Sequence, residues 1–206
     1  MTGTNDAAID QNRQASLQRQ EILSAAERLL AKRGFDGLRL RDVSIHAGVS
    51  IGLIQHYFYT RDELVRETLE TASIRRASEW AASASQAEDG PSKVKALLLG
   101  SVTDRERCTI WLETCAAASR YPEFQTLTAN TTTVWRDALG QAIEQGVAEG
   151  HFELSSPVEH VVGILVGLID GMMLAVAVQI PNYTPDYVNS LLLDVARAQL
   201  GMDFQS

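Results

Sequence analysis

Histidine and cysteine are the side chains of this sequence that most often serve catalysis or metal binding, but their spacing favours neither role. The four histidines are scattered, and none forms a pair at metal-ligand spacing such as HExxH: His46, His56, His151 and His160. No Ser/His/Asp set for nucleophilic catalysis can be inferred. We therefore predict no catalytic residue, no metal site and no cofactor. A small all-α enzyme stays open as an alternative.

The two cysteines, Cys108 and Cys115, are too few for a disulfide framework and suit a reducing cytoplasm. Seven residues apart on one helix, they would be separated by about 10 Å of helical rise, which exceeds the reach of an unstrained disulfide. We interpret them as small buried hydrophobic residues. The alternative is a regulator that senses thiol-reactive compounds through either cysteine.

Side chains suited to reading nucleic-acid bases gather in the segment AGVSIGLIQHYFYTRDEL, residues 47–64. Gln55 can pair with adenine, while the apolar tips of Ile51 and Leu53 can contact thymine methyl groups. Gly52 lets the backbone approach the nucleic acid closely. The exposed face of a helix over this segment would mix apolar and polar side chains. Such a mixture is expected where a helix contacts bases and phosphates.

The elements around this segment have the spacing of a helix-turn-helix. A short helix over 40–47 ends at Gly48, and a second helix begins with Ser50 as its N-cap. Ile54 and Phe58 lie one turn apart and point inward. A purely structural helical hairpin is the alternative interpretation of this pattern.

A longer helix, over 16–33, precedes this pair and completes a three-helix unit. Gly34 can stop it in the left-handed conformation. Its apolar positions form one face: Ile22, Ala25, Ala26, Leu29 and Leu30. Residues 1–12 are polar and aperiodic, and we expect a disordered arm there, so that the helix-turn-helix domain covers 13–60.

Charge separates this unit from the rest of the chain. Residues 13–61 carry eight Lys or Arg against four Asp or Glu, a net charge of +4, although the whole chain has −8. Residues 62–206 carry −10, and residues 1–12 carry the other −2. A basic head on an acidic body indicates that only the head meets a polyanion.

The body, residues 61–206, is expected to be helical as well, because apolar residues recur at intervals of three and four. Thr60 caps the first of its helices. The predicted ranges are 61–85, 92–102, 104–119, 122–150, 157–180 and 185–200. The chain is therefore predicted to be all-α with about nine helices.

The most apolar of these helices could be mistaken for a membrane span. Asp170 near its centre would cost about 2.5 to 3.5 kcal/mol in a bilayer, and its flanks lack basic residues. We expect no membrane insertion. Gly163, Gly167 and Gly171 lie on consecutive turns and form a flat stripe suited to a subunit interface.

Aromatic and polar residues of the body provide material for a ligand cavity. The candidates are Cys108, Trp111, Cys115, Phe124, Trp135, Asp170 and Met173. Ordinary core packing is the alternative for each of them. Arg107 and Glu113 are interpreted as solvated surface residues.

The head, with GFDGLRLRDVS before the segment at 47–64, resembles the DNA-binding domain of the TetR family of transcriptional regulators. The resemblance implies DNA contacts by ten residues: Arg39, Arg41, Ser50, Ile51, Gly52, Leu53, Gln55, His56, Tyr57 and Arg61. Arg61 stands where the family usually has a phosphate-binding lysine. Arg39 departs from the Thr or Ser that often caps the second helix.

The body contains ALLLGS, WLETCAAASRYPEF, GLIDG and NYTPDYV, and is similar to the regulatory domain of the BetI-like branch of that family. This resemblance implies a cytoplasmic homodimer held by a four-helix bundle and bound to a palindromic double-stranded DNA operator. A small-molecule effector in the body would release the DNA, with the helix that begins at Arg61 as the connection. We therefore predict a ligand-responsive regulator, most simply a repressor.

Overall fold

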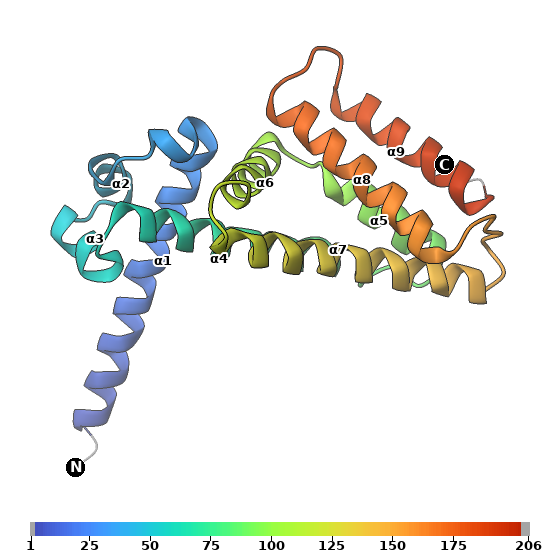
Figure 1. The fold of residues 1–206 in the computed structure, drawn as a ribbon. Coiled ribbons are helices and arrows are strands. Elements are labelled where there is room, and N and C mark those ends of the chain that lie inside the picture. The colour runs from blue at the N-terminus through green and yellow to red at the C-terminus, as the bar shows by residue number, and fades with distance from the viewer. Residues whose placement is uncertain (1–2, 203–206) are drawn as a thin grey trace. The chain divides into compact units, whose positions relative to one another are not determined.

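The computed structural model describes residues 3–202 of the chain, and within them it contains nine α-helices and no strand (Figure 1). The predicted all-α class is confirmed. The chain divides into two compact units, residues 1–72 and residues 73–206. Helix α4 (Arg61–Ala82) contributes its first half to one unit and its second half to the other.

The first unit is built from α1 (Gly3–Gly37), α2 (Leu40–Ala47), α3 (Ile51–Phe58) and the beginning of α4. The predicted inner face of α1 is buried, and α2 packs against both α1 and α3. Gly34 interrupts α1 with a φ of 72°, the left-handed conformation that ends its long regular part. The sequence therefore predicted the core of this unit and its main turn.

The start of α1 differs from the sequence prediction. The helix begins at Gly3, where we expected a disordered arm over 1–12; Met1 and Thr2 lie outside the described residues. No glycine or proline occurs between Thr4 and Arg33 to stop a helix. The backbone of residues 3–12 therefore continues the regular helix that packs further along.

The second unit contains the end of α4 and five further helices: α5 (Gly90–Ser101), α6 (Arg105–Ala118), α7 (Glu123–Ala148), α8 (Val158–Ala177) and α9 (Pro185–Leu200). Asp89, Asp104 and Thr184 cap α5, α6 and α9 through side-chain oxygens that accept backbone N–H groups. Helices α6, α7 and α8 pack against one another, and α9 packs against α8 (Figure 1). The helix bounds in both units lie within three residues of the predicted ones, apart from the start and the end of α1.

Helix α8 is long and apolar enough to cross a membrane by length and composition alone, and half of its most apolar stretch is buried within the second unit. Its inner face joins the hydrophobic core through residues such as Leu165, Ile169 and Met173. Those features are typical of the core helix of a soluble helical domain.

Candidate functional site

A tight turn between α2 and α3 sets the direction of the candidate DNA-reading helix. Gly48 has a φ of 67°, and its N–H donates to the Ser44 carbonyl. The Ser44 hydroxyl in turn donates to the Val49 carbonyl at 2.5 Å. The Ser50 hydroxyl accepts the Leu53 N–H at 3.1 Å, which confirms the predicted N-cap of α3.

Helix α3 has one buried face and one face open to solvent. Ile54 and Phe58 are fully buried, as predicted from their spacing. Ile51 is 41% exposed, and Gln55 and His56 are exposed as well. Also exposed are Ser50 and Gly52, whereas Leu53 and Tyr57 are partly covered. The open face thus presents the mixture of apolar and hydrogen-bonding groups from which a base-reading surface can be made.

Arg61 is engaged inside the first unit. Its Nε donates to the Leu38 carbonyl at 3.1 Å, another guanidinium nitrogen donates to the Phe35 carbonyl, and a third pairs with Asp62 at 2.7 Å. The guanidinium also lies over the Phe35 ring, 5.2 Å from its centroid. Arg61 therefore ties the start of α4 to the last turn of α1 and to the residue that follows this helix, a positioning role that the sequence analysis missed.

Arg39 and Arg41 are exposed at the start of α2. Arg39 occupies the N-cap position of α2, and its side chain makes no capping hydrogen bond. The departure from the family's Thr or Ser therefore leaves α2 without a side-chain cap. Both guanidinium groups are placed to meet solvent or a polyanion.

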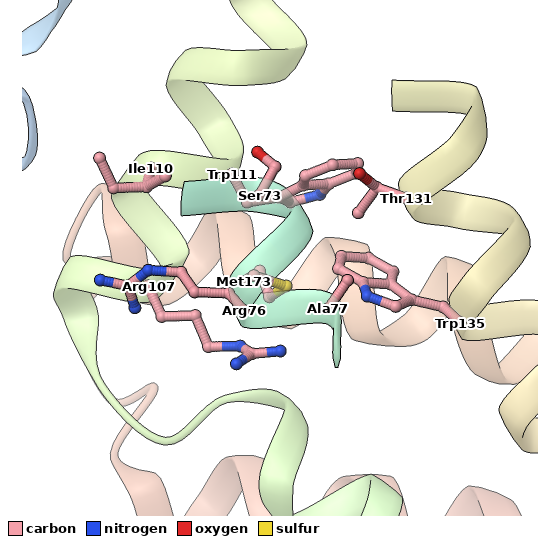
Figure 2. A pocket seen from close by; sticks show the side chains of 9 residues that line it. All are labelled: Ser73, Arg76, Ala77, Arg107, Ile110, Trp111, Thr131, Trp135 and Met173. Carbon is pink, nitrogen blue, oxygen red and sulfur yellow. The ribbon is translucent and has the colours of Figure 1, made fainter. Parts of the chain in front are cut away.

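The second unit contains a narrow cavity of about 10 Å³, room for about one water molecule. Figure 2 shows its nine lining residues: Ser73, Arg76, Ala77, Arg107, Ile110, Trp111, Thr131, Trp135 and Met173. They come from α4, α6, α7 and α8. The walls are almost in contact, so that a larger ligand must separate them.

The structure brings together three of the seven residues predicted to line a cavity, Trp111, Trp135 and Met173. Asp170 lies behind this wall, where its carboxylate accepts the indole N–H of Trp111 at 3.0 Å. Burial raises the pKa of Asp170, partly offset by this hydrogen bond. The other three predicted residues, Cys108, Cys115 and Phe124, do not line the cavity.

Two arginines of the cavity wall escaped the sequence analysis. Arg107, interpreted there as a solvated residue, is only 8% exposed. Burial lowers the pKa of Arg107, and the positive charge of Arg76 lowers it further. Arg76 pairs with Glu106 at 3.2 Å and lies 4.0 Å from Asp104. The spacing of Arg107 three and four positions before Ile110 and Trp111 was the available signal, because it places all three on one helix face.

The two cysteines are free thiols, Cys108 buried and Cys115 half-buried. Burial raises the pKa of Cys108 to about 11 and the pKa of Cys115 to about 12. The negative charge of Asp170 contributes to the rise at Cys115. Only the thiolate is a strong nucleophile. Both thiols are therefore poorly suited to fast reaction with electrophiles.

The open face of α3, held by a glycine turn and a serine cap, defines the first unit as a helix-turn-helix DNA-binding domain. Residues 22–68 match the profile of the tetR family of bacterial regulatory proteins. Residues 92–201, more than half of the chain, match the C-terminal domain of BetI-type transcriptional repressors. The chain therefore belongs to the TetR family of transcriptional regulators. These families consist of transcriptional regulators and not enzymes, which confirms the prediction that the chain is not an enzyme.

Individual relatives agree with this assignment. The repressor KstR2 of Mycolicibacterium smegmatis is 25% identical over 70% of this chain and 72% of its own length. PksA of Bacillus subtilis is 40% identical over 47 residues, which cover 23% of each chain.

Solved structures share the fold. A TetR-family regulator from Rhodococcus has a TM-score of 0.73 and 26% identity over 90% of this chain and 99% of its own. A regulator from Saccharomonospora viridis, solved in complex with choline, has a TM-score of 0.80 and 22% identity, over 87% of this chain and 95% of its own.

The thiols provide the first testable prediction. At pH 8 a rise in pKa from 9.0 to about 11 lowers the thiolate fraction about 100-fold, and a rise to about 12 lowers it about 1,000-fold. Iodoacetamide should therefore label Cys108 and Cys115 slowly in the folded protein and rapidly in urea. Mass spectrometry of the alkylated peptides measures both rates. Equal rates in the folded and unfolded protein would contradict the burial of the thiols and revive a sensing role.

Proposed function

We propose that this chain is a ligand-responsive repressor that binds a palindromic operator in double-stranded DNA as a homodimer. The open face of α3 is the observation that carries the proposal. A helix that follows a tight turn and exposes Ile51, Gln55 and His56 suits the major groove. The natural place for such a regulator is the cytoplasm, where the DNA of a bacterium lies.

Within the head, the contacts divide into base reading and phosphate binding. Gln55 offers an amide that can pair with adenine, and Ile51 offers an apolar tip for a thymine methyl group. Arg39 and Arg41 supply positive charge at the start of α2. Two nitrogens of the Arg61 guanidinium donate to the carbonyls of Phe35 and Leu38, so only its other N–H groups are free to bind phosphate. We expect the main effect of Arg61 to be on the position of α4.

The outer face of α8 supports a dimer with a second copy of this chain. A Cβ added to Gly167 or Gly171 would meet no atom within 4 Å among the described residues. Ile164 and Leu174 lie beside the stripe and are 45% and 47% exposed. A flat glycine stripe bordered by exposed aliphatic side chains is costly in water and suits close approach of another helix.

The cavity of the second unit is the proposed effector site, and α4 is the proposed connection to the head. Ser73, Arg76 and Ala77 of α4 line the cavity. An effector that separates the walls would favour a conformation in which the two recognition helices no longer fit the operator. The buried thiols offer no support for the alternative of a thiol-sensing regulator.

Selection from a random DNA library tests the proposed operator and the roles of the head residues. We expect the selected sequences to be palindromic, with half-sites one helical turn or a multiple of it apart. Gln55→Ala should relax the preference at one base position in each half-site, by roughly 1 to 3 kcal/mol if the contact is bidentate. Arg39→Ala should weaken binding about equally across sequences and lower the salt slope by about one unit.

The two variants serve as controls for each other, because both side chains are exposed and neither substitution should change the melting temperature. A Gln55→Ala protein that selects the unchanged sequence would contradict the base-reading role. Failure of the parent protein to enrich any palindrome would contradict the proposed function itself.

The glycine stripe provides a prediction about the dimer. Gly167→Leu should place a branched side chain between two closely packed helices, which costs roughly 1 to 3 kcal/mol for each contact. The variant should dissociate to monomers on dilution, as measured by analytical ultracentrifugation. Its affinity for a full operator should fall toward its affinity for a half-site. The expected loss is a factor of about 10² to 10⁴, because the second head is no longer tethered to the first.

Gln125→Leu adds the same side chain at an exposed position of α7 and is the matched control. It should remain a dimer. If the Gly167→Leu dimer is as stable as the parent dimer, the dimer uses another surface.

A further inference from the structure

The cavity of the second unit contains two buried hydrogen-bond donors that lack acceptors. Among the described residues, nothing accepts from Nε of Arg107 or from Nε1 of Trp135. Both side chains are more than nine-tenths buried, with 8% and 4% exposed. Buried donors in folded proteins are nearly always satisfied, so this pair indicates an acceptor that the protein does not supply: a water molecule, for which the cavity has room, or the polar end of a ligand that displaces it.

The charge of the wall defines that group further. Arg76 and Arg107 both line the cavity, while no Asp or Glu belongs to the lining. The negative charges of Asp104 and Glu79 act on Arg107, but Asp104 lies 4.0 Å from Arg76 and Glu79 pairs with Arg75.

Figure 2 shows the two arginine side chains of the lining beside each other on one side of the cavity, with Ala77 between them and the indole of Trp135. Arg76 already pairs with Glu106, whereas Arg107 forms no salt bridge among the described residues. An anion in the cavity would compensate the charge of Arg107, whereas a cation would be repelled.

The remaining wall is apolar and aromatic. The rings of Trp111 and Trp135 lie 4.6 Å apart between centroids, with their planes tilted by 51°. The indole N–H of Trp111 is already bonded to Asp170, which fixes that ring and leaves the N–H of Trp135 for a ligand. Met173 and Ala77 complete the apolar part. This wall can cover a hydrocarbon or aromatic body but offers few partners for a polar one.

We propose that the effector is a small organic carboxylate with an apolar or aromatic body. Its carboxylate oxygens accept hydrogen bonds from Nε of Arg107 and Nε1 of Trp135, and Arg76 supplies the second positive charge. The body separates the two indoles from Ala77 of α4. This inference rests on the proposed function, since it names the chemical class of the ligand that the cavity admits.

A panel of small carboxylates, aliphatic from two to ten carbons and aromatic, tests the class when it is compared with the matched primary amides. Thermal unfolding of the full chain measures stabilisation, because a ligand that binds only the folded state raises the melting temperature. We expect at least one carboxylate to raise it and its amide to bind about tenfold or more weakly, since a charged acceptor is lost. Equal effects of acid and amide, or no effect of any acid, would overturn the proposal.

Arg107→Met is the decisive variant, because it keeps an unbranched apolar stem and removes both the charge and the unsatisfied donor. We expect it to keep or exceed the parent melting temperature without ligand, and to weaken the active carboxylate about tenfold or more. Arg75→Met is the matched control: its side chain is exposed on α4, pairs with Glu79 and does not line the cavity. It should bind the carboxylate like the parent. Unchanged affinity in Arg107→Met would overturn the proposal.

Binding to the selected operator, measured by fluorescence anisotropy, separates this proposal from the proposed function. If a neutral or cationic compound releases the operator and no carboxylate does, the chain is ligand-responsive and the inferred ligand class is wrong. If no palindromic DNA is bound at all, the proposed function fails whatever the panel shows.

Discussion

The continuity of helix α4 is the constraint on which the rest of this structure depends. Its first half, with Leu64 and Leu69, is buried in the core of the DNA-binding unit, and its second half, with Ala77, forms a wall of the cavity. No glycine or proline occurs between residues 61 and 82 to absorb a bend. The Thr60 cap and the bonds of Arg61 hold its beginning. The proposed function therefore takes α4 as the connection between the cavity and the DNA-binding unit.

The narrow cavity complements this connection. It has room for about one water molecule, yet its wall contains two donors that lack acceptors among the described residues, and Arg107 lies beside a second arginine. Arg76 already pairs with Glu106, so the charge that an anion in the cavity would compensate is that of Arg107. A ligand that satisfies these donors would bind more tightly when the cavity walls are apart than when they are together. Such a difference in affinity between two arrangements is what a population shift requires.

Sequence alone predicted the architecture because strong local signals agree along the chain. Glycine turns, hydroxyl and carboxylate caps, and apolar residues at intervals of three and four located nearly every helix. The same signals placed Ile54 and Phe58 inward. Their neighbours on the open face of α3 are candidates for reading DNA for the same reason. The predicted disordered arm failed because polar composition says little about helix propagation from an adjoining stable helix.

The cavity was only partly predictable, because it is a property of packing between four helices. Aromatic composition pointed to Trp111 and Trp135, but it could not separate them from Phe124, which packs elsewhere. Arg107 was misjudged because charged residues are mostly exposed. Its position one turn before Trp111 indicated that it shares the buried face of the helix, whereas its residue type indicated exposure. The carbonyls that hold Arg61 come from residues 35 and 38, more than twenty positions away, and no local pattern shows them.

The central claim, that α4 transmits the state of the cavity to the head, is tested most directly by a double-mutant cycle on affinity for the selected operator. Ala77→Leu should wedge the cavity wall apart and mimic the effector. Glu70→Gly with Thr71→Gly loosens α4 at two exposed positions, at about 1 kcal/mol each. If α4 carries the change, Ala77→Leu should weaken operator binding about tenfold in the parent helix and less than about twofold in the loosened one. The same factor in both backgrounds, with helical content intact by circular dichroism, would contradict it.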